Sequence, residues 1–358
     1  MYITEIMTAI YSINPLLLIF PCTPQGVENR QIVGELACAA PLAAISSPVV
    51  LEALSVVKKS FTKKEFIKTT ESIFGAAEAA ESAFLALLEH QILVATAAAS
   101  RGSWDEHQWA EAWMYHRGTR SYPFIDMGDE SGAIEDRERM REYSKISPPP
   151  SNYKVMQGER IELEKISRND SIQNKLDSMP ISLKRKLPGL SMFFDVCFGE
   201  RGKVSFENQG KFLQKSIPSG GARHPTEAYL VSFEDEELAP GVYHYNVQEH
   251  CLTLINKGQY FDLCSEATFD LFKKYKRKPK HLLILTSIYE RAMWRYRDSR
   301  SWRAIPMDVG HALMLFRVMS EAIGYDSYTY QKFDDDALEK LLCISKISET
   351  PLFVGTMV

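Results

Sequence analysis

The chain has 358 residues, of which 45% are hydrophobic and 25% are charged, as in ordinary folded, water-soluble proteins. Its formal net charge of −4 provides no overall positive field, which argues against a nucleic-acid-binding protein. The length exceeds what a single compact core usually holds, so the chain is expected to form two domains.

Neither a membrane anchor nor a metal site is expected. The apolar run LLLIF at 16–20 is too short to span a bilayer, and no basic segment of the kind that opens a signal peptide precedes it. The six cysteines show neither a Cys-x-x-Cys spacing nor a pairing with histidines. These features predict a cytoplasmic protein whose thiols are free and which holds no zinc ion.

Residues 1–98 are expected to form a winged-helix-like domain. Two short extended runs, INPLLLIF and RQIVGEL, surround a Thr-Pro-Gln-Gly turn, and SPVVLEALSVV has the spacing of an amphipathic helix. Thr62 and Glu65 form a capping box ahead of a second helix, and AAEAAESAFLALLEHQILVA predicts a third helix that runs into a short strand. A small sheet element, three helices and a closing strand are the order expected of a winged-helix domain.

Three roles are compatible with this first domain. It could be a purely structural module, it could bind DNA, or it could bind a peptide at a sheet edge. Because the stretch 42–100 carries few basic residues, its charge suits a peptide better than DNA.

Residues 99–172 are expected to connect two domains. The aromatic residues of WDEHQWAEAWMYHRGTR recur at helical spacing, which favours packing over a cofactor role. The charged stretch EDRERMREYSK predicts a solvated helix or a flexible segment, and the prolines of SPPPSNY at 147–153 mark a joint that no helix can cross.

From residue 173 the pattern changes to that of a mixed helix and sheet domain, which reaches to residue 358. EAYLVSF (227–233) and HLLILTSI (281–288) predict buried strands. The segment 307–325 predicts a long core helix that ends at Gly324. Helices that alternate with strands in this way suggest an α+β or α/β catalytic domain.

The loop PSGGARHP at 218–225 combines backbone freedom with hydrogen-bonding capacity. The adjacent Gly220 and Gly221 allow close approach of a ligand to the backbone, and Ser219 adds a hydroxyl. Arg223 supplies a planar cation suited to a phosphate or to a flavin edge. The loop is therefore either a ligand site or a plain glycine-rich turn before a strand.

The surrounding sequence resembles one enzyme family. PSGGARHPTEAYLVSF is followed by LAPGVYHYNVQEHCLTLI, later by YERAMWRYRDSRSWRAIPMDVGHALMLFRVMSEAIG, and near the end by TPLFVGTMV. This order resembles the SagB-type dehydrogenases of the nitroreductase superfamily over about residues 175–358. These are flavin enzymes that oxidise azolines to azoles in thiazole- and oxazole-containing peptides.

The resemblance implies an α+β, nitroreductase-like fold that binds FMN at the interface of a homodimer. The flavin would be lined by the loop, with Pro218, Ser219, Gly220, Gly221, Arg223 and His224 as the cofactor-binding residues. His224 would either face the flavin or brace the loop. The first domain would then hold a precursor peptide or help the chain to dimerise.

The sequence departs from the family where the FMN phosphate is usually held. The expected Arg-x-Ser-x-Arg segment has its nearest match in RNDSIQN at 168–174, where only Arg168 is basic. Arg297, Arg300 and Arg303 are the replacement candidates, because arginine binds phosphate bidentately. Their alternative role is ion pairing on a surface loop.

A second departure concerns the catalytic pair. Where the resembled family usually has Lys-Tyr, this chain has Arg295 and Tyr296. Arginine stays protonated and cannot act as a general base, so Tyr296 is the better candidate for removing a proton, with Arg295 favouring its phenolate form. The alternative is that Tyr296 packs beside Trp294 and Trp302.

The resemblance implies an FMN-dependent dehydrogenase that acts on azolines of a peptide or carrier-bound substrate, next to a cyclodehydratase partner. A nicotinamide-dependent, nitroreductase-like reductase is a second possibility, although the chain has no GxGxxG fingerprint. A third is a non-catalytic scaffold subunit of a peptide-modifying complex, because the phosphate-binding arginines and the lysine of the pair are absent.

Overall fold

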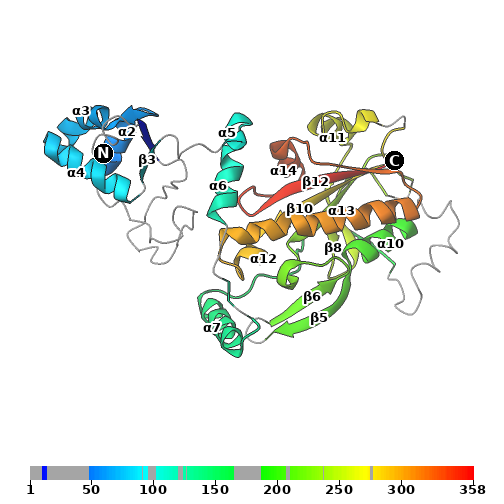
Figure 1. Cartoon of the computed structure of the whole chain (residues 1–358). Coiled ribbons are helices and arrows are strands. Elements are labelled where there is room, and N and C mark those ends of the chain that lie inside the picture. Colours follow the sequence, from blue (N-terminus) through cyan, green and yellow to red (C-terminus); the bar gives the residue numbers. More distant parts are fainter. Residues whose placement is uncertain are drawn as a thin grey trace. The chain divides into compact units, whose positions relative to one another are not determined.

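The computed structural model describes residues 10–13, 48–90, 92–95, 102–119, 124–125, 127–164, 187–206, 210–236, 238–274 and 277–358. The chain divides into two compact units, Met1–Phe124 and Ile125–Val358, called here the N-terminal unit and the C-terminal unit (Figure 1). No helix in these described segments is long and apolar enough to cross a membrane.

The first part of the N-terminal unit, as far as the structure describes it, folds as three helices and a three-stranded antiparallel sheet. Its elements in chain order are β1 (Ile10–Ile13), α2 (Pro48–Val56), β2 (Phe61–Thr62), α3 (Lys63–Phe74), α4 (Ala77–Glu89) and β3 (Leu93–Ala95). The predicted capping box is confirmed, since the Thr62 hydroxyl accepts from the Glu65 backbone N–H at 3.2 Å and the Glu65 carboxylate accepts from the Thr62 backbone N–H at 2.7 Å. Helix α3 ends at Gly75, whose φ of 83° is in the left-handed region.

The sheet order β2-β1-β3 places the strand that precedes the first helix at the centre. Tyr11 of this strand packs edge-on against Phe84 of α4 at 5.1 Å, and Phe66 of α3 completes the small core. Of the two predicted extended runs, only the first residue of INPLLLIF, Ile13, lies within the described residues. The described elements include no wing hairpin, so the winged-helix assignment stays a prediction.

Two short helices, α5 (Ser103–Glu106) and α6 (Ala110–Gly118), follow in the same unit. Trp104 stacks on His116 with a centroid distance of 6.0 Å and also contacts Trp109 and Trp113. These aromatic side chains pack on one another, as the helical spacing predicts.

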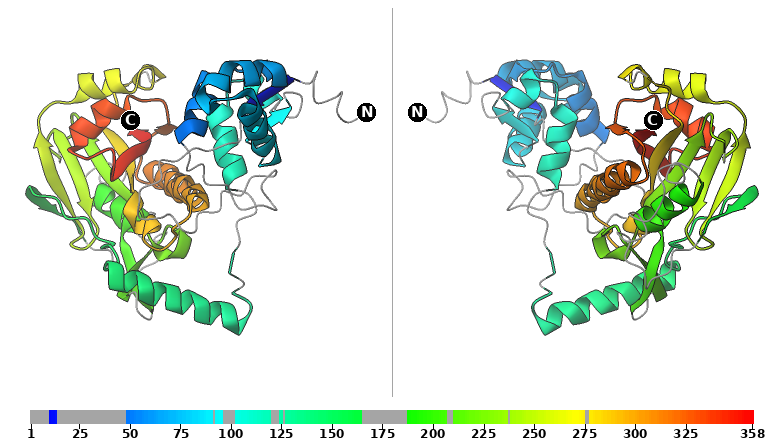
Figure 2. Two further views of the ribbon diagram at one scale, coloured as in Figure 1. Left: turned by 90° about the vertical axis from the view of Figure 1, so that its left-hand side faces the viewer. Right: turned by 90° about the vertical axis from the view of Figure 1, so that its right-hand side faces the viewer.

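The C-terminal unit is built on a seven-stranded sheet in the order β11-β12-β10-β7-β8-β9-β4, in which every neighbouring pair is antiparallel (Figures 1 and 2). Its strands are β4 (Glu159–Glu162), β7 (Thr226–Ser232), β8 (Gly241–Asn246), β9 (Cys251–Lys257), β10 (His281–Ile288), β11 (Ser327–Tyr330) and β12 (Glu349–Met357). A separate hairpin is formed by β5 (Glu200–Phe206) and β6 (Gly210–Lys215).

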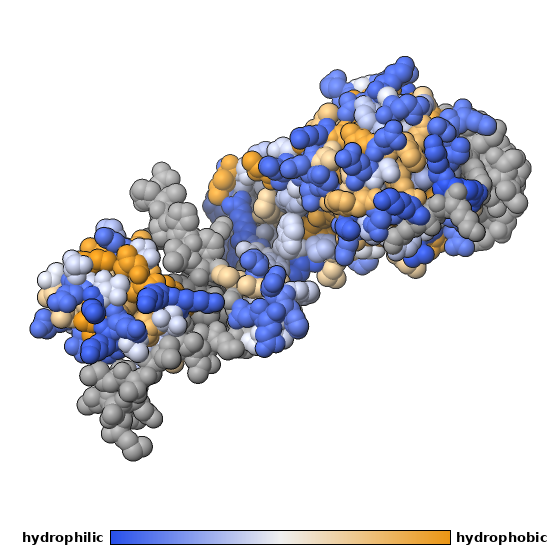
Figure 3. Space-filling view, turned by 90° about the horizontal axis from the view of Figure 1, so that it is seen from above, coloured by the Kyte–Doolittle hydropathy of each residue, from blue (hydrophilic) through white to orange (hydrophobic). Residues whose placement is uncertain are grey.

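Helices cover both faces of the sheet. The helical elements are α7 (Glu130–Ile146), α10 (Leu187–Phe198), η2 (Gly220–Ala222), α11 (Phe261–Ala267), η3 (Phe272–Lys274), α12 (Tyr289–Met293), η4 (Ser299–Arg303), α13 (Ala304–Ala322) and α14 (Asp335–Leu342). Alternate residues of the central strands face opposite sides: Leu283 and Leu285 of β10 pack with α10 and α13, whereas Leu282 and Ile284 pack with α11 and α14. Hydrophilic and hydrophobic residues are interspersed on the face of the molecule seen in Figure 3.

The long helix α13 matches its prediction. Val309, Ala312 and Phe316 are fully buried against the sheet, and Gly324 follows the helix with a φ of 90°. The predicted strands at 227–233 and 281–288 are β7 and β10, so the α+β fold class is confirmed. The three-part division at residues 98 and 172 stays a prediction, and the compact units meet at 124/125.

Candidate functional site

The loop 218–225 connects the β5–β6 hairpin to the central strand β7. Three of its residues have left-handed backbone angles: φ is 59° at Gly221, 53° at Ala222 and 46° at His224. A residue with a Cβ pays about 1 kcal/mol for such a conformation. Contacts from other segments must therefore impose the shape of this loop.

One such contact comes from the first turns of α13. The Ser219 hydroxyl donates to Asp308 Oδ2 at 2.6 Å and accepts from the His224 backbone N–H at 2.9 Å. Burial raises the pKa of Asp308, and the hydrogen bonds from Ser219 and Gly220 act in the opposite direction. Because the Ser219 proton is directed at Asp308, this serine braces the loop.

A second contact comes from the segment that follows α12. A Cβ atom on Gly221 would lie 2.2 Å from Tyr296 Oη, so the tyrosine occupies the space that any other residue would need. On Gly220 the added Cβ would meet only the Ala304 Cβ, at 3.4 Å. Gly221 thus serves two needs, the left-handed backbone and the close approach of Tyr296.

The structure brings the predicted pair Arg295 and Tyr296 together. The Arg295 guanidinium lies 5.0 Å from the Tyr296 ring centroid and forms an ion pair with Asp136 of α7 at 2.6 Å. Both charged side chains are largely buried, at 19% and 17% exposed. The Arg295 charge, which was expected to favour the phenolate form of Tyr296, is therefore also paired with Asp136.

Arg223 is buried beneath the loop. Its guanidinium lies 4.2 Å from the centroid of the Phe212 ring and 5.9 Å from that of Trp294. Burial lowers its pKa to about 10, while the nearby Tyr296 favours the charged form and Arg295 opposes it. Arg223, Tyr296 and Arg295 thus form one electrostatic group.

Neighbouring residues form hydrogen bonds with both backbone polar groups of His224. Its N–H donates to Ser219, and its carbonyl accepts from Arg291 Nη1 at 2.9 Å. Burial, aided by the charge of Lys215, lowers the pKa of His224 to about 3, so the imidazole is neutral near pH 7. These contacts support the bracing alternative for His224.

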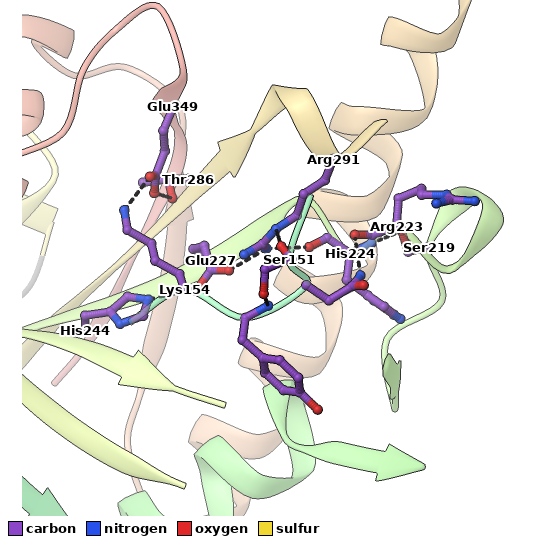
Figure 4. Close-up of polar contacts among 12 residues, drawn as sticks. Ser151, Lys154, Ser219, Arg223, His224, Glu227, His244, Thr286, Arg291 and Glu349 are labelled. Atoms are coloured by element: carbon purple, nitrogen blue, oxygen red, sulfur yellow. Dashed lines mark hydrogen bonds and ion pairs between the residues drawn. The ribbon is translucent and has the colours of Figure 1, made fainter. Parts of the chain in front are cut away.

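Arg291 ties three segments together beneath the loop (Figure 4). Besides His224, it donates to the Ser151 carbonyl at 2.8 Å and to Glu227 Oε1 at 2.5 Å. Burial alone would raise the pKa of Glu227, but Arg291 and then His244, at 2.8 Å, hold it well below the usual range. Asn152 joins the same assembly by donating to the Arg223 carbonyl at 3.0 Å.

A second buried polar group adjoins the first. Glu349 of β12 accepts from Thr286 at 2.5 Å, from Tyr229 at 3.0 Å and from Lys154 (Figure 4). Burial and the Glu349 charge raise the pKa of Tyr229, which therefore stays protonated. The joint 147–153 and Lys154 are thus part of the region around the loop.

The three arginines proposed for phosphate lie in one segment. Arg300 and Arg303 belong to η4, directly before α13, and Arg297 stacks over the Tyr143 ring of α7 at 3.7 Å. The segment RNDSIQN lies outside the described residues. The stacking on Tyr143 places the Arg297 guanidinium against α7.

The region offers a polar ligand unused donors. The Gly221 N–H makes no hydrogen bond within the described part of the chain, and the residue is exposed. Thr226 and Ser287 are cross-strand partners whose buried hydroxyls find no partner among the described residues. Of these donors, only the N–H of the exposed Gly221 is open to a flavin, which carries carbonyl and ring nitrogen acceptors, because the two hydroxyls are enclosed by the fold.

The sequence pattern did not mark Asp308, Glu227, His244 or Arg291. Each is a charged or titratable residue on the buried side of an otherwise apolar element. A charged residue within an otherwise apolar stretch could have identified these positions in the sequence, because a charge is buried only where the fold provides a partner for it.

Comparison with known proteins finds a family model that matches part of the chain and relatives that are similar over a longer stretch. Residues 203–357 match the model of the nitroreductase family. The trifolitoxin-processing protein TfxB of Rhizobium leguminosarum bv. trifolii is 24% identical over 255 residues, which cover 68% of each chain. The trifolitoxin operon protein TfxC of the same organism is 22% identical over 302 residues, covering 77% of this chain and 80% of TfxC.

A solved structure is also similar. The E. coli microcin synthetase McbBCD complex with truncated pro-MccB17 bound contains a chain that is 19% identical, with a TM-score of 0.41. The match covers 63% of this chain and 91% of that one.

Proposed function

Because residues 203–357 form a nitroreductase-family domain, we propose that the protein is an FMN-dependent dehydrogenase that oxidises azolines to azoles on a peptide or carrier-bound substrate. The observation that carries this proposal is the loop 218–225, in which the exposed Gly221 packs against the Tyr296 hydroxyl, and Tyr296 in turn interacts electrostatically with Arg223. The relative named as a trifolitoxin-processing protein supports a role in peptide modification.

FMN would supply the acceptor for the hydride that leaves the azoline ring. The chain's residues would position the reactants: the N–H of the exposed Gly221 can donate to a flavin edge. Arg297, Arg300 and Arg303 are the candidates for the phosphate, and Arg297 also stacks on the Tyr143 ring of α7.

Tyr296 is the proposed general base. Loss of a hydride from one ring carbon must be matched by loss of a proton from its neighbour, so a group must hold that proton at a defined place. Tyr296 Oη lies at the backbone of Gly221, where a ligand of the loop would bring its substrate. Arg295 would hold Tyr296 in place by its contact with the ring, and Asp136 would fix Arg295.

A homodimer is part of the proposal. Helix α13 buries one face against the sheet and exposes Met307, Met314 and Val318 on the other. These three residues are spaced by seven and four positions, so they share one helix face. A second copy related by a twofold axis would cover this apolar stripe. The N-terminal unit would hold the substrate peptide, and a cyclodehydratase would deliver the azoline.

The ion pair between Arg295 and Asp136 favours one rival function, a non-catalytic scaffold of a peptide-modifying complex, because it withdraws Arg295 from chemistry. The flavin content of the purified protein tests the two directly. An enzyme should release about one FMN per chain on denaturation. A protein that is colourless and does not take up added FMN would be the scaffold.

A further inference from the structure

A pocket lies in the C-terminal unit next to Arg291, the residue that holds the His224 carbonyl of the loop. Its volume is about 400 Å³, near the lower end of the range for small-ligand sites. The joint before β4, the start of α12 and the turn between α14 and β12 line it. Nothing in the proposed flavin site uses this space.

The floor of the pocket is built from buried charges. Arg291 is 3% exposed and Glu349 is 4% exposed, and both line the pocket together with Lys154 (Figure 4). Each charge already has a counter-charge, because Arg291 pairs with Glu227 and Lys154 pairs with Glu349. The floor is therefore neutral overall.

Hydrogen-bond donors remain at this floor. Within the described part of the chain, Arg291 donates through Nε and Nη1, and no hydrogen bond uses Nη2. The ammonium of Lys154 has two acceptors, Tyr229 and Glu349, and three protons. A neutral acceptor such as a carbonyl oxygen suits these donors better than a carboxylate, since the exposed Glu290 at the rim repels an anion.

The walls of the pocket are apolar. Met156, Ile288 and Ile344 are half-buried and line it, so an aliphatic side chain would lose water contact on entering. A carbonyl group next to an aliphatic side chain is the repeating unit of a peptide. We propose that this pocket is a docking subsite for a peptide segment, held by an aliphatic side chain against the walls and a backbone carbonyl against Arg291 and Lys154.

This subsite rests on the proposed function, which makes a peptide the substrate, and it adds a recognition site outside the flavin loop. Arg291 belongs to the pocket floor and also holds the His224 carbonyl of the loop. A segment bound in the pocket would therefore lie next to the group that fixes the loop, and it would anchor the substrate close to the reaction site.

Cys343 offers a direct test, because its thiol is exposed and lines the pocket. The full chain is equilibrated with disulfide-linked probes under partial reduction, and capture at Cys343 is measured by mass spectrometry. The probes are acetyl-leucine amide, acetyl-aspartate amide and an alkyl analogue of the leucine probe without carbonyl groups, each on the same thiol linker. Cys343→Ser gives the background from the other thiols.

We expect capture of the leucine probe about tenfold above the aspartate probe, the effect of burying part of one aliphatic side chain, and also above the alkyl analogue. Ile344→Asp should remove this preference. Ile347→Asp is the matched control, because Ile347 lies on the same turn, is 85% exposed and does not line the pocket. Equal capture of all probes, or a preference that survives Ile344→Asp, would overturn the subsite.

The peptide subsite and the proposed dehydrogenase function can be disproved independently of each other. A protein that holds FMN and oxidises azolines but shows no leucine preference would lack only the subsite. A protein that shows the preference, lost in Ile344→Asp, but binds no flavin would keep the subsite and disprove the proposed function.

Discussion

The loop 218–225 keeps an unfavourable backbone shape because side chains distant in sequence hold it from three sides. Asp308 fixes Ser219, Asn152 holds the Arg223 carbonyl, and Arg291 holds the carbonyl of His224. Two non-glycine residues in the left-handed region are characteristic of sites where function requires a particular backbone path. The loop is therefore held by hydrogen bonds at its base, while Gly221 is exposed.

Gly221 should tolerate no side chain. Gly221→Ala places a Cβ 2.2 Å from Tyr296 Oη and adds the cost of a left-handed alanine, about 1 kcal/mol. We expect lower stability in urea unfolding and loss of bound FMN on purification. Gly220→Ala is the matched control and should keep both properties, because its Cβ meets only the Ala304 Cβ at 3.4 Å. Equal behaviour of the two variants would contradict the close-approach argument.

Tyr296 should matter for turnover and not for flavin binding. Tyr296→Phe keeps the ring contact with Arg295 and removes the hydroxyl, so single-turnover flavin reduction should slow by on the order of 100-fold. Arg295→Lys should retain more activity than Arg295→Ala, because a lysine can still pair with Asp136. Wild-type rates in Tyr296→Phe would place the base elsewhere.

His224 should make the protein sensitive to acid. Its pKa falls from 6.5 to about 3 on folding, so between these values the unfolded chain binds more protons than the folded chain. Stability should therefore fall as the pH is lowered through this window, by up to about 1.4 kcal/mol per pH unit. His224→Asn, which tolerates a positive φ, should reduce the stability difference between pH 7 and pH 5 in urea unfolding. An unchanged difference would show that His224 is not the group responsible.

At the scale of elements, the periodic segments were predictable and the contacts between them were not. The spacing of Val309, Ala312 and Phe316 predicts α13, and the apolar run 281–288 predicts β10, because burial of one helix face or of a whole strand leaves a local pattern. The motif at 218–225 likewise marks the loop. Its partners could not be predicted, because Asp308 is 89 positions from Ser219, and local patterns do not encode such pairing.

The exposed stripe of α13 leads to a prediction about assembly. Met314→Glu places a charge in the centre of the stripe, and burying it without a partner should weaken a homodimer at least about tenfold. Sedimentation or light scattering across a dilution series measures this. Ile347→Glu, at an exposed site on another element, should leave the dimer intact. A wild-type chain that is monomeric with flavin bound would rule out this interface.

At the scale of the whole molecule, the C-terminal unit contains the whole described loop region together with the polar groups beneath it, and the N-terminal unit has its own small core. This separation suits a chain in which one unit performs chemistry and the other holds a peptide, as proposed above. The length of the chain predicts two domains, and the resemblance in the second part rests on motifs that surround the loop. No sequence motif marks a binding surface on the N-terminal unit, so the sequence predicts the role of this unit less directly.

The proposed function requires this chain to pass a hydride from an azoline to a flavin. The most direct measurement is anaerobic mixing of the FMN-loaded full-length protein with a synthetic peptide that carries one thiazoline, followed through the visible absorbance of the flavin and the mass of the peptide. We expect the flavin to bleach and the peptide to lose two hydrogens, in equal molar amounts. Flavin that stays oxidised with the thiazoline peptide yet bleaches with NADPH would contradict this expectation.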